Sequence, residues 1–141
     1  MIKRFQLKLP SHTDYLDLIR DFISKLAGHS GFDEENVYKI ALAVDEACTN
    51  VIRHAYSKNE MNPIDIEVQL DDKIFTVIVS DTGRGFDPDS VNEPDLEDIM
   101  LRHKVGGFGL YLIKTLMDEV DFSIDPEVRN EVRMTKHLKR D

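Results

Sequence analysis

The sequence predicts an α+β fold, a two-layer sandwich in which helices cover one face of a mixed, mainly antiparallel sheet. Three observations predict this class. Some segments alternate apolar and polar residues as strands do, others repeat apolar residues at helical spacing, and tight turns join successive strands. With 141 residues the chain is long enough to bury a core, and we expect one domain over residues 1–141.

The first part of the chain predicts a strand and then a helix. Residues 3–9 alternate with a period of two, as in a half-buried strand. Ser11 and Asp14 resemble a capping box in front of a helical apolar pattern, and Gly28 is expected to end that helix. Asp33 is expected to cap the next helix, because its side chain can accept a bond from the first free backbone N–H groups.

The second helix, predicted over 36–56, carries two distinct faces. Glu46, Asn50 and His54 recur every four residues and therefore stack as a polar ridge on successive turns. The ridge either contributes side chains to a site or is an ordinary solvated face. The other face is an apolar stripe formed by Val37, Ile40, Ala41, Val44, Ala47, Cys48, Val51, Ile52 and Ala55.

The rest of the chain predicts four more strands and one more helix. A turn at Asp71 and Asp72 joins the first two of these strands, and the second of them is apolar enough to be central. The roughly twenty residues at 86–105 lack periodicity, and a connection of that length suggests a lid over a binding site. The expected strands are 64–70, 73–81, 120–125 and 128–138, and the expected helix lies within 106–120.

A carboxylate and two glycines follow the central strand. Asp81 ends the run of β-formers, and Gly83 and Gly85 come directly after it. Glycine tolerates positive φ and the close approach of a ligand, so this stretch predicts a pocket beside a strand end. The alternative is a plain turn, in which Asp-Thr-Gly are common residues.

A second glycine cluster precedes the last predicted helix. Gly106, Gly107 and Gly109 lie where the first N–H groups of a helix lack partners, and such a terminus favours phosphate. Simple loop-to-helix packing is the alternative. The sequence lacks a G-x-x-x-x-G-K-[ST] loop, a complete G-x-G-x-x-G fingerprint and the protein-kinase H-R-D and D-F-G motifs.

Charge and composition exclude other classes. The formal net charge of −9 argues against nucleic-acid binding, which depends on cationic contacts to phosphate. No apolar run approaches the ~20 residues of a membrane span, so no membrane association is expected. The single cysteine, Cys48, cannot form an internal disulfide, and a cytoplasmic location is expected.

Three of these motifs together resemble the ATP-binding fold of the gyrase, Hsp90, histidine-kinase and MutL superfamily, also called the GHKL or Bergerat fold. Within it, the stretches DEACTNVIRHAY and GGFGLYLIKTLMDEV are similar to the bacterial anti-sigma-factor serine/threonine kinases of the RsbW type. The matching boxes are Glu46-x-x-x-Asn50, Asp81-x-Gly83-x-Gly85 and Gly106-Gly107-x-Gly109-Leu110.

The resemblance implies a role for each box in binding Mg-ATP. Asp81 would accept a hydrogen bond from the adenine amino group, with Gly85 letting the base lie close. Asn50 would hold Mg²⁺ against the phosphates, and Gly107 and Gly109 would cradle them beneath the lid.

The resemblance also implies the chemistry. Glu46 would be the general base that activates a serine or threonine hydroxyl, and Lys104 at the end of the lid is a candidate contact to the γ-phosphate. The chain departs from the superfamily where Arg129 and Asn130 replace the usual Gly-Thr. Asn130 could hold the adenine-bound water by its amide.

We therefore predict an ATP-dependent protein serine/threonine kinase that acts as an anti-sigma factor. Its implied partners are a sigma factor and a STAS-domain anti-anti-sigma factor, and the family implies a homodimer that regulates transcription in a stress response. The alternatives are a non-catalytic ATP-dependent binding module and a histidine-kinase catalytic domain acting in trans.

Overall fold

The computed structural model describes residues 1–55, 62–84 and 106–138. The predicted order of helices and strands is confirmed over these ranges. The elements are β1 (Lys3–Pro10), a 3₁₀ turn (Thr13–Tyr15), α1 (Leu16–Ser30), α2 (Glu34–Asn50), a π-helical turn (Val51–Ala55), β2 (Pro63–Leu70), β3 (Ile74–Asp81), α4 (Gly106–Leu116), β4 (Glu119–Asp125) and β5 (Arg129–His137).

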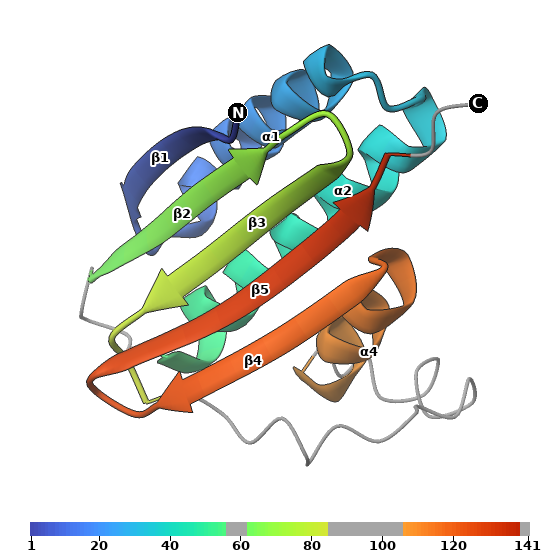
Figure 1. Ribbon diagram of the computed structural model, residues 1–141. Helices are drawn as coiled ribbons and strands as arrows, with labels where there is room; N and C mark the ends of the chain where they lie inside the picture. Colours follow the sequence, from blue (N-terminus) through green and yellow to red (C-terminus); the bar gives the residue numbers. More distant parts are fainter. Residues whose placement is uncertain (56–61, 85–105, 139–141) are drawn as a thin grey trace.

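The described strands form one open sheet in the order β1-β2-β3-β5-β4, with the helices against one face (Figure 1). Each pairing between them is antiparallel, so the described sheet has no parallel pair and is simpler than the mixed sheet expected. Strand β3 is central, as predicted, and all of its residues except Ile74 are buried. The last strand, β5, lies between β3 and β4, which brings its first residues beside the end of β3.

The core lies between the sheet and the helices. Phe75, Val77 and Val79 of β3 point into it, and because side chains alternate along a strand, Thr76 and Ile78 face the other side of the sheet. Helix α2 packs against α1 on one side and α4 on the other. Among the described helices, none is both long and apolar enough to cross a membrane.

Helix α1 ends at Ser30 with Gly31 as its C-cap, so the prediction that Gly28 ends it is wrong. Gly31 has φ 106° and its N–H bonds the carbonyls of Ala27 and Gly28, a left-handed cap that only glycine adopts without strain. Gly28 lies inside the helix, where a Cβ would meet no atom within 4 Å. The apolar spacing of α1 continues to Ala27, and both Gly28 and Gly31 follow it, so the pattern alone did not decide which glycine ends the helix.

The predicted caps have different outcomes. Asp33 caps α2 as expected, since its side chain accepts from the backbone N–H of Asn36. The capping box at Ser11 and Asp14 is wrong. Instead, His12 caps the 3₁₀ turn, because its Nδ1 accepts from the Asp14 N–H at 3.1 Å.

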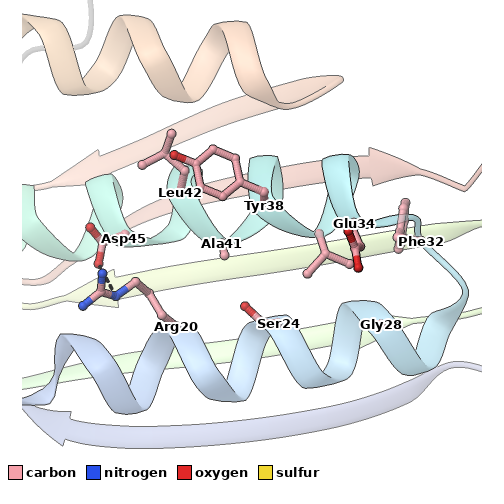
Figure 2. Close-up of a pocket in the computed structure, with 10 residues that line it drawn as sticks. Arg20, Ser24, Gly28, Phe32, Glu34, Tyr38, Ala41, Leu42 and Asp45 are labelled. Atoms are coloured by element: carbon pink, nitrogen blue, oxygen red, sulfur yellow. Dashed lines mark ion pairs between the residues drawn. The ribbon is translucent and has the colours of Figure 1, made fainter.

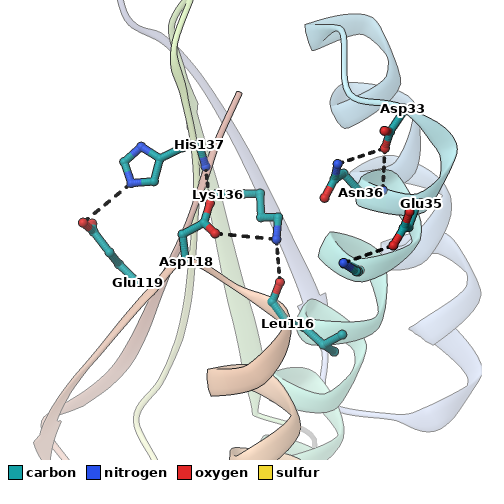
Figure 3. Close-up of polar contacts among 9 residues, drawn as sticks. Asp33, Glu35, Asn36, Leu116, Asp118, Glu119, Lys136 and His137 are labelled. Atoms are coloured by element: carbon teal, nitrogen blue, oxygen red, sulfur yellow. Dashed lines mark hydrogen bonds and ion pairs between the residues drawn. The ribbon is translucent and has the colours of Figure 1, made fainter. Parts of the chain in front are cut away.

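A buried lysine fixes the C-terminal end of α4 (Figure 3). Lys136 Nζ donates to the Leu116 carbonyl at 2.8 Å and lies 3.8 Å from Asp118 Oδ1. Leu116 is the last residue of α4, so this bond satisfies a carbonyl that the helix itself leaves free. Lys136 pairs with Phe75 near the start of β3, so the C-terminal end of α4 lies near the start of β3 and its first turn points toward the end that carries Asp81 (Figure 1).

Candidate functional site

Helix α2 brings Glu46 and Asn50 onto successive turns at its C-terminal end. Asn50 is only 6% exposed, and neither its amide nitrogen nor its oxygen has a hydrogen-bond partner in the described part of the chain. The alternative of a solvated face is therefore wrong for Asn50. The side chain of His54, the third member of the predicted ridge, lies outside what the structure describes.

The same end of α2 changes its helical geometry. The α-helix ends at Asn50, and the predicted continuation to residue 56 is a π-helical turn over Val51–Ala55. Such turns concentrate at functional sites, since they shift the register of the following side chains. The sequence carries no Pro or Gly there that could have revealed it.

Glu46 has the properties of a proton acceptor. Its Oε2 is buried and has no hydrogen-bond partner among the described residues. Burial raises the pKa of this carboxyl, and the neighbouring charge of Asp45 raises it further, against a lowering effect of Arg53. A carboxylate with a raised pKa and a free oxygen can take a proton from a hydroxyl placed beside it.

Asp81 is the last residue of β3, and its carboxylate is buried. It is 7% exposed, and its Oδ1 accepts from the Gly83 N–H at 2.8 Å and from Asn130 Nδ2 at 3.0 Å. The bond to Gly83 is that of an Asx turn, so the plain-turn interpretation describes the backbone correctly. The turn and a pocket are compatible, because the turn uses only one of the two carboxylate oxygens.

Of the two reasons for expecting glycine at position 83, the positive φ is wrong, and the close approach of a ligand stays a prediction. Among the described glycines only Gly31 has a positive φ, so Gly83 does not need the left-handed region. Gly83 is buried, and its carbonyl accepts from Asn130 Nδ2 at 2.9 Å and from the Glu127 N–H at 2.7 Å. Gly85 lies outside the described residues.

Asn130 lies beside Asp81, the residue expected to bind adenine, although only the resemblance and no local pattern in the sequence implied this position. It is 2% exposed and pairs with Asp81 across β3 and β5, 49 residues apart in the chain. Its neighbour Arg129 faces the other side of the sheet, where it donates to Ser80 Oγ at 3.1 Å and to Glu131 Oε1 at 2.6 Å. Of the two residues that replace the usual Gly-Thr, only Asn130 therefore contacts Asp81 at the end of β3.

Helix α4 begins at Gly106, so the cluster of glycines forms its first turn instead of preceding it. The N–H groups of the first four residues have no partners within a helix, and here three of those residues are glycines: Gly106, Gly107 and Gly109. Leu110 follows in the same helix. Lys104 and the predicted lid over 86–105 lie outside the described residues.

These pieces lie toward the same end of the sandwich. Figure 1 shows the C-terminal end of α2, the tip of β3 and the first turn of α4 in that region. The arrangement offers the half-buried acid Glu46, the unpaired amide of Asn50, the carboxylate oxygen of Asp81 that the turn does not use, and a helix N-terminus. It therefore can bind a ligand with a polar ring at one end and phosphates at the other.

A separate hollow lies between α1 and α2 (Figure 2). Its volume is about 510 Å³, and apolar side chains such as Val37 and Ala41 line much of it. Arg20 Nε lies 3.5 Å from Asp45 Oδ1 at one end. Burial raises the pKa of Asp45, and Arg20 opposes that effect. This hollow contains none of the predicted site residues.

The chain matches known proteins over nearly its whole length. A family model described as "Histidine kinase-like ATPase domain" matches residues 9–136. The serine-protein kinase RsbW of Bacillus subtilis is 36% identical over 138 residues, which cover 94% of this chain and 84% of the relative. The serine-protein kinase RsbW of Listeria monocytogenes is 34% identical over 142 residues, with 98% and 89% covered.

Solved structures share the fold. The RsbU and RsbW domains of a Mycobacterium tuberculosis protein match with a TM-score of 0.70 and 16% identity, over 99% of this chain and 33% of that one. A chain of the SiaB–SiaC complex from Pseudomonas aeruginosa matches with a TM-score of 0.67 and 13% identity, over 93% and 88%. At these identities the likeness shows the fold alone.

Proposed function

The chain belongs to the histidine kinase-like ATPase family, and from that premise we propose that it is an ATP-dependent serine-protein kinase and anti-sigma factor of the RsbW type. The relatives called serine-protein kinase RsbW support the activity. The observation that carries the proposal within this molecule is the pair on α2: an unpaired buried Asn50 one helical turn from Glu46, an acid with a raised pKa.

In this proposal the nucleotide is held at both ends. Asp81 reads the adenine amino group through the oxygen that the turn leaves free, with Gly83 and Gly85 beside the base. The first turn of α4, through Gly106, Gly107, Gly109 and Leu110, donates N–H groups to the phosphates. Residues 86–105 form the lid, and Lys104 contacts the γ-phosphate. The 1–141 chain is then one ATP-binding domain.

Magnesium fits the donor set. The Asn50 oxygen is a hard ligand without a partner among the described residues, which contain no cluster of three or more His, Cys, Asp or Glu side chains able to hold a metal. Mg²⁺ usually takes one or two protein oxygens and completes its shell with phosphates and water, so a single amide is sufficient. When bound, the metal neutralises phosphate charge that this chain, at −9, would otherwise repel.

The chain's own contribution to transfer is positioning and one proton acceptor. The serine hydroxyl oxygen of the partner bonds to the γ-phosphorus, the bond from that phosphorus to the β–γ bridging oxygen breaks, and ADP leaves. Glu46 takes the hydroxyl proton. Most of the lowering of the barrier comes from placing the two reactants in line.

We further propose that the phosphorylated partner is a STAS-domain anti-anti-sigma factor and that the unmodified partner competes with a sigma factor. The protein would act in the cytoplasm as a homodimer and regulate transcription under stress. Size-exclusion chromatography with light scattering tests the dimer, and a monomer at all concentrations contradicts it.

The kinase assay mixes the purified protein with Mg-ATP labelled at the γ-phosphate and a STAS-domain protein from the same organism. We expect label on the partner as acid-stable phosphoserine, and loss of label with Glu46→Gln. Acid-labile label would assign a histidine kinase instead. Nucleotide binding without any transfer would assign the non-catalytic module.

A further inference from the structure

One face of the sheet is covered by no other described element. The helices pack against the opposite face (Figure 1), and side chains alternate along each strand, so every second residue points away from the core. We call this surface the outer face. Its centre is formed by Thr76, Ile78 and Ser80 of β3, which are uncharged and buried among their neighbours.

The charges on the outer face follow the order of the strands. The bases are Arg4 and Lys8 on β1 and Arg133 on β5. The acids are Asp65 and Glu67 on β2 and Glu119, Asp121 and Asp125 on β4. Arg129 and Glu131, also on β5, neutralise each other, since Nε and Oε1 are 2.6 Å apart. Across the sheet, the strands are therefore positive, negative, neutral, positive and negative.

This order makes the outer face complementary to itself. Two strands lie on each side of β3, and each has the opposite sign to the strand at the same distance on the other side. A second copy, turned by 180° about an axis along β3 and laid face to face, places its β4 over β1 and its β5 over β2. Stacked sheets keep their strands within about 30° of each other, so this matching of strands is preserved. An axis across the strands would place each strand over itself, and like charges would then meet.

The strand register brings the opposite charges to the same height. Glu67, Ile78 and Arg133 lie side by side on β2, β3 and β5. The rotation about β3 therefore places Glu67 opposite Arg133 of the second copy and Ile78 opposite the second Ile78. Arg4 and Glu119 also share a height, through the paired residues Gln69, Thr76 and Thr135. They face each other in the same way.

One position brings two acids together. Asp65 and Glu131 share a height through Ser80, so each would face the other across the axis. Both line a hollow of about 440 Å³ on the outer face, which leaves room for water between them. Glu131 is already paired with Arg129, so this position opposes the contact less than an unpaired acid would.

The size of the outer face fits a dimer of moderate stability. Five strands about 4.8 Å apart and about eight residues long present roughly 600 Å² to a partner. Stable interfaces bury about 600–1,000 Å² on each partner, so this face is at the lower end of that range. Its uncharged centre at β3 can lose water at little cost, and we expect the dimer to dissociate on dilution.

We propose that the outer face is the homodimer interface and that it joins two copies about a twofold axis along β3. The inference rests on the proposed function for the existence of a dimer. The family resemblance implied a homodimer without indicating a surface, and the order and register of the strands supply that surface.

Charge reversal at one facing pair tests the proposal. Glu67→Arg and Arg133→Glu should each raise the dissociation constant of the dimer by about 10²-fold, because each creates two contacts between like charges. In an equal mixture of the two variants both contacts join opposite charges, so a heterodimer should form within about tenfold of the wild-type constant. Sedimentation velocity over a dilution series measures the constants, and native mass spectrometry identifies the heterodimer.

Two further sets of variants complete the experiment. Lys25→Glu is the matched control, since Lys25 is exposed on α1 in the helix layer and its reversal should leave the dissociation constant unchanged. Circular dichroism checks that each variant is folded. Arg4→Glu and Glu119→Arg, the second facing pair, replace the first pair if either of its members does not fold.

Three results overturn the proposal. The first is a wild-type protein that is monomeric at every concentration. The second is a dimer that both single variants retain, which would assign the interface to another surface. The third is a mixture of folded variants that stays monomeric, which would exclude the axis along β3. The kinase assay on the same samples is scored separately: absence of transfer would refute the proposed function, whereas the pattern of dimer loss and recovery would still stand.

Discussion

Replacing Asn50 with alanine should make the nucleotide-free protein more stable while abolishing its stabilisation by Mg-ATP. Asn50 is 6% exposed, and both of its polar side-chain atoms lack partners among the described residues. Alanine removes both unpaired groups and is the better helix former. The substitution therefore separates what the side chain does for the fold from what it does for the ligand.

The magnitude follows from the two orphaned groups at Asn50. A buried polar group left unpaired costs about 1–3 kcal/mol, so two cost at least about 2 kcal/mol. The void that the missing amide leaves, ~25 Å³, reduces this gain in stability by about 0.6 kcal/mol, at roughly 24 cal/mol per Å³. The net gain expected for Asn50→Ala without ligand is about 1–2 kcal/mol in the free energy of unfolding.

Bound Mg-ATP should make wild type more stable than Asn50→Ala, the reverse of the order without nucleotide. Wild type gains about 2.7 kcal/mol when Mg-ATP is present at 100 times its dissociation constant. The alanine variant, without the metal ligand, should gain little at the same concentration. Wild type should then be the more stable of the two by about 1 kcal/mol.

Urea unfolding followed by circular dichroism, with and without Mg-ATP, measures all four free energies. Asn36→Ala is the matched control, since Asn36 lies on the same helix but its Nδ2 is paired with Asp33 Oδ1 at 2.9 Å. That variant should lose a little stability and keep the full response to Mg-ATP. A nucleotide-free Asn50→Ala protein less stable than wild type would refute the reasoning, because it would mean that the Asn50 amide is already satisfied.

Four further predictions concern Glu46 and Lys136. Glu46→Gln should keep its affinity for Mg-ATP and lose phosphoryl transfer by about 10²-fold in the kinase assay; retained transfer would remove Glu46 from the mechanism. Glu46 must be ionised to accept the hydroxyl proton, so phosphoryl transfer should fall on acidification. Because burial raises the pKa of Glu46, its ionised form also lowers the free energy of unfolding. For the same reason the Gln variant should melt higher than wild type at neutral pH, with the difference vanishing as the carboxyl is protonated. A pH titration of rate and melting temperature checks both, and a rate that rises on acidification contradicts the assignment. Lys136→Met should lower the free energy of unfolding by about 1–3 kcal/mol, since Leu116 and Asp118 lose a buried partner; Lys39→Met, at an exposed pair, should change it by less than about 0.5 kcal/mol in the same urea titration.

Features that depend on a few neighbouring residues were predictable from the sequence. The Asp33 cap needs only a short acceptor side chain before a helical pattern, and the structure contains it. The central position of β3 follows from apolar residues on both faces. Gly28 shows the limit of this reasoning, because the choice of Gly31 depends on where the chain must turn toward α2.

Features that depend on strand register were not predictable. Asn130 meets Asp81 only because β5 lies between β3 and β4, and the sequence contains no local signal for that order. The resemblance implied that its amide holds an adenine-bound water; the strand register commits the nitrogen of that amide to Asp81 and Gly83 and leaves its oxygen unpaired. The burial of Asn50 had a similar origin, because it depends on the packing of α2 among α1, α4 and the sheet.

The distribution of unpaired polar atoms argues for a ligand more directly than any one motif does. In the described part of the chain, five buried side-chain atoms lack a hydrogen-bond partner, and they belong to Asp45, Glu46, Asn50 and Asn130. The fold pairs buried polar groups elsewhere, as Lys136 with the Leu116 carbonyl shows. Asp45 has the nearby charge of Arg20, which leaves Glu46, Asn50 and Asn130 as the unexplained set. Conflicts between burial and pairing persist in natural proteins mainly where function requires them. Glu46 and Asn50 belong to one motif on α2, and Asn130 lies 80 residues further along the chain in β5. The chemistry given for each, as proton acceptor, metal ligand and holder of the adenine-bound water, nevertheless uses an atom that the fold leaves unpaired.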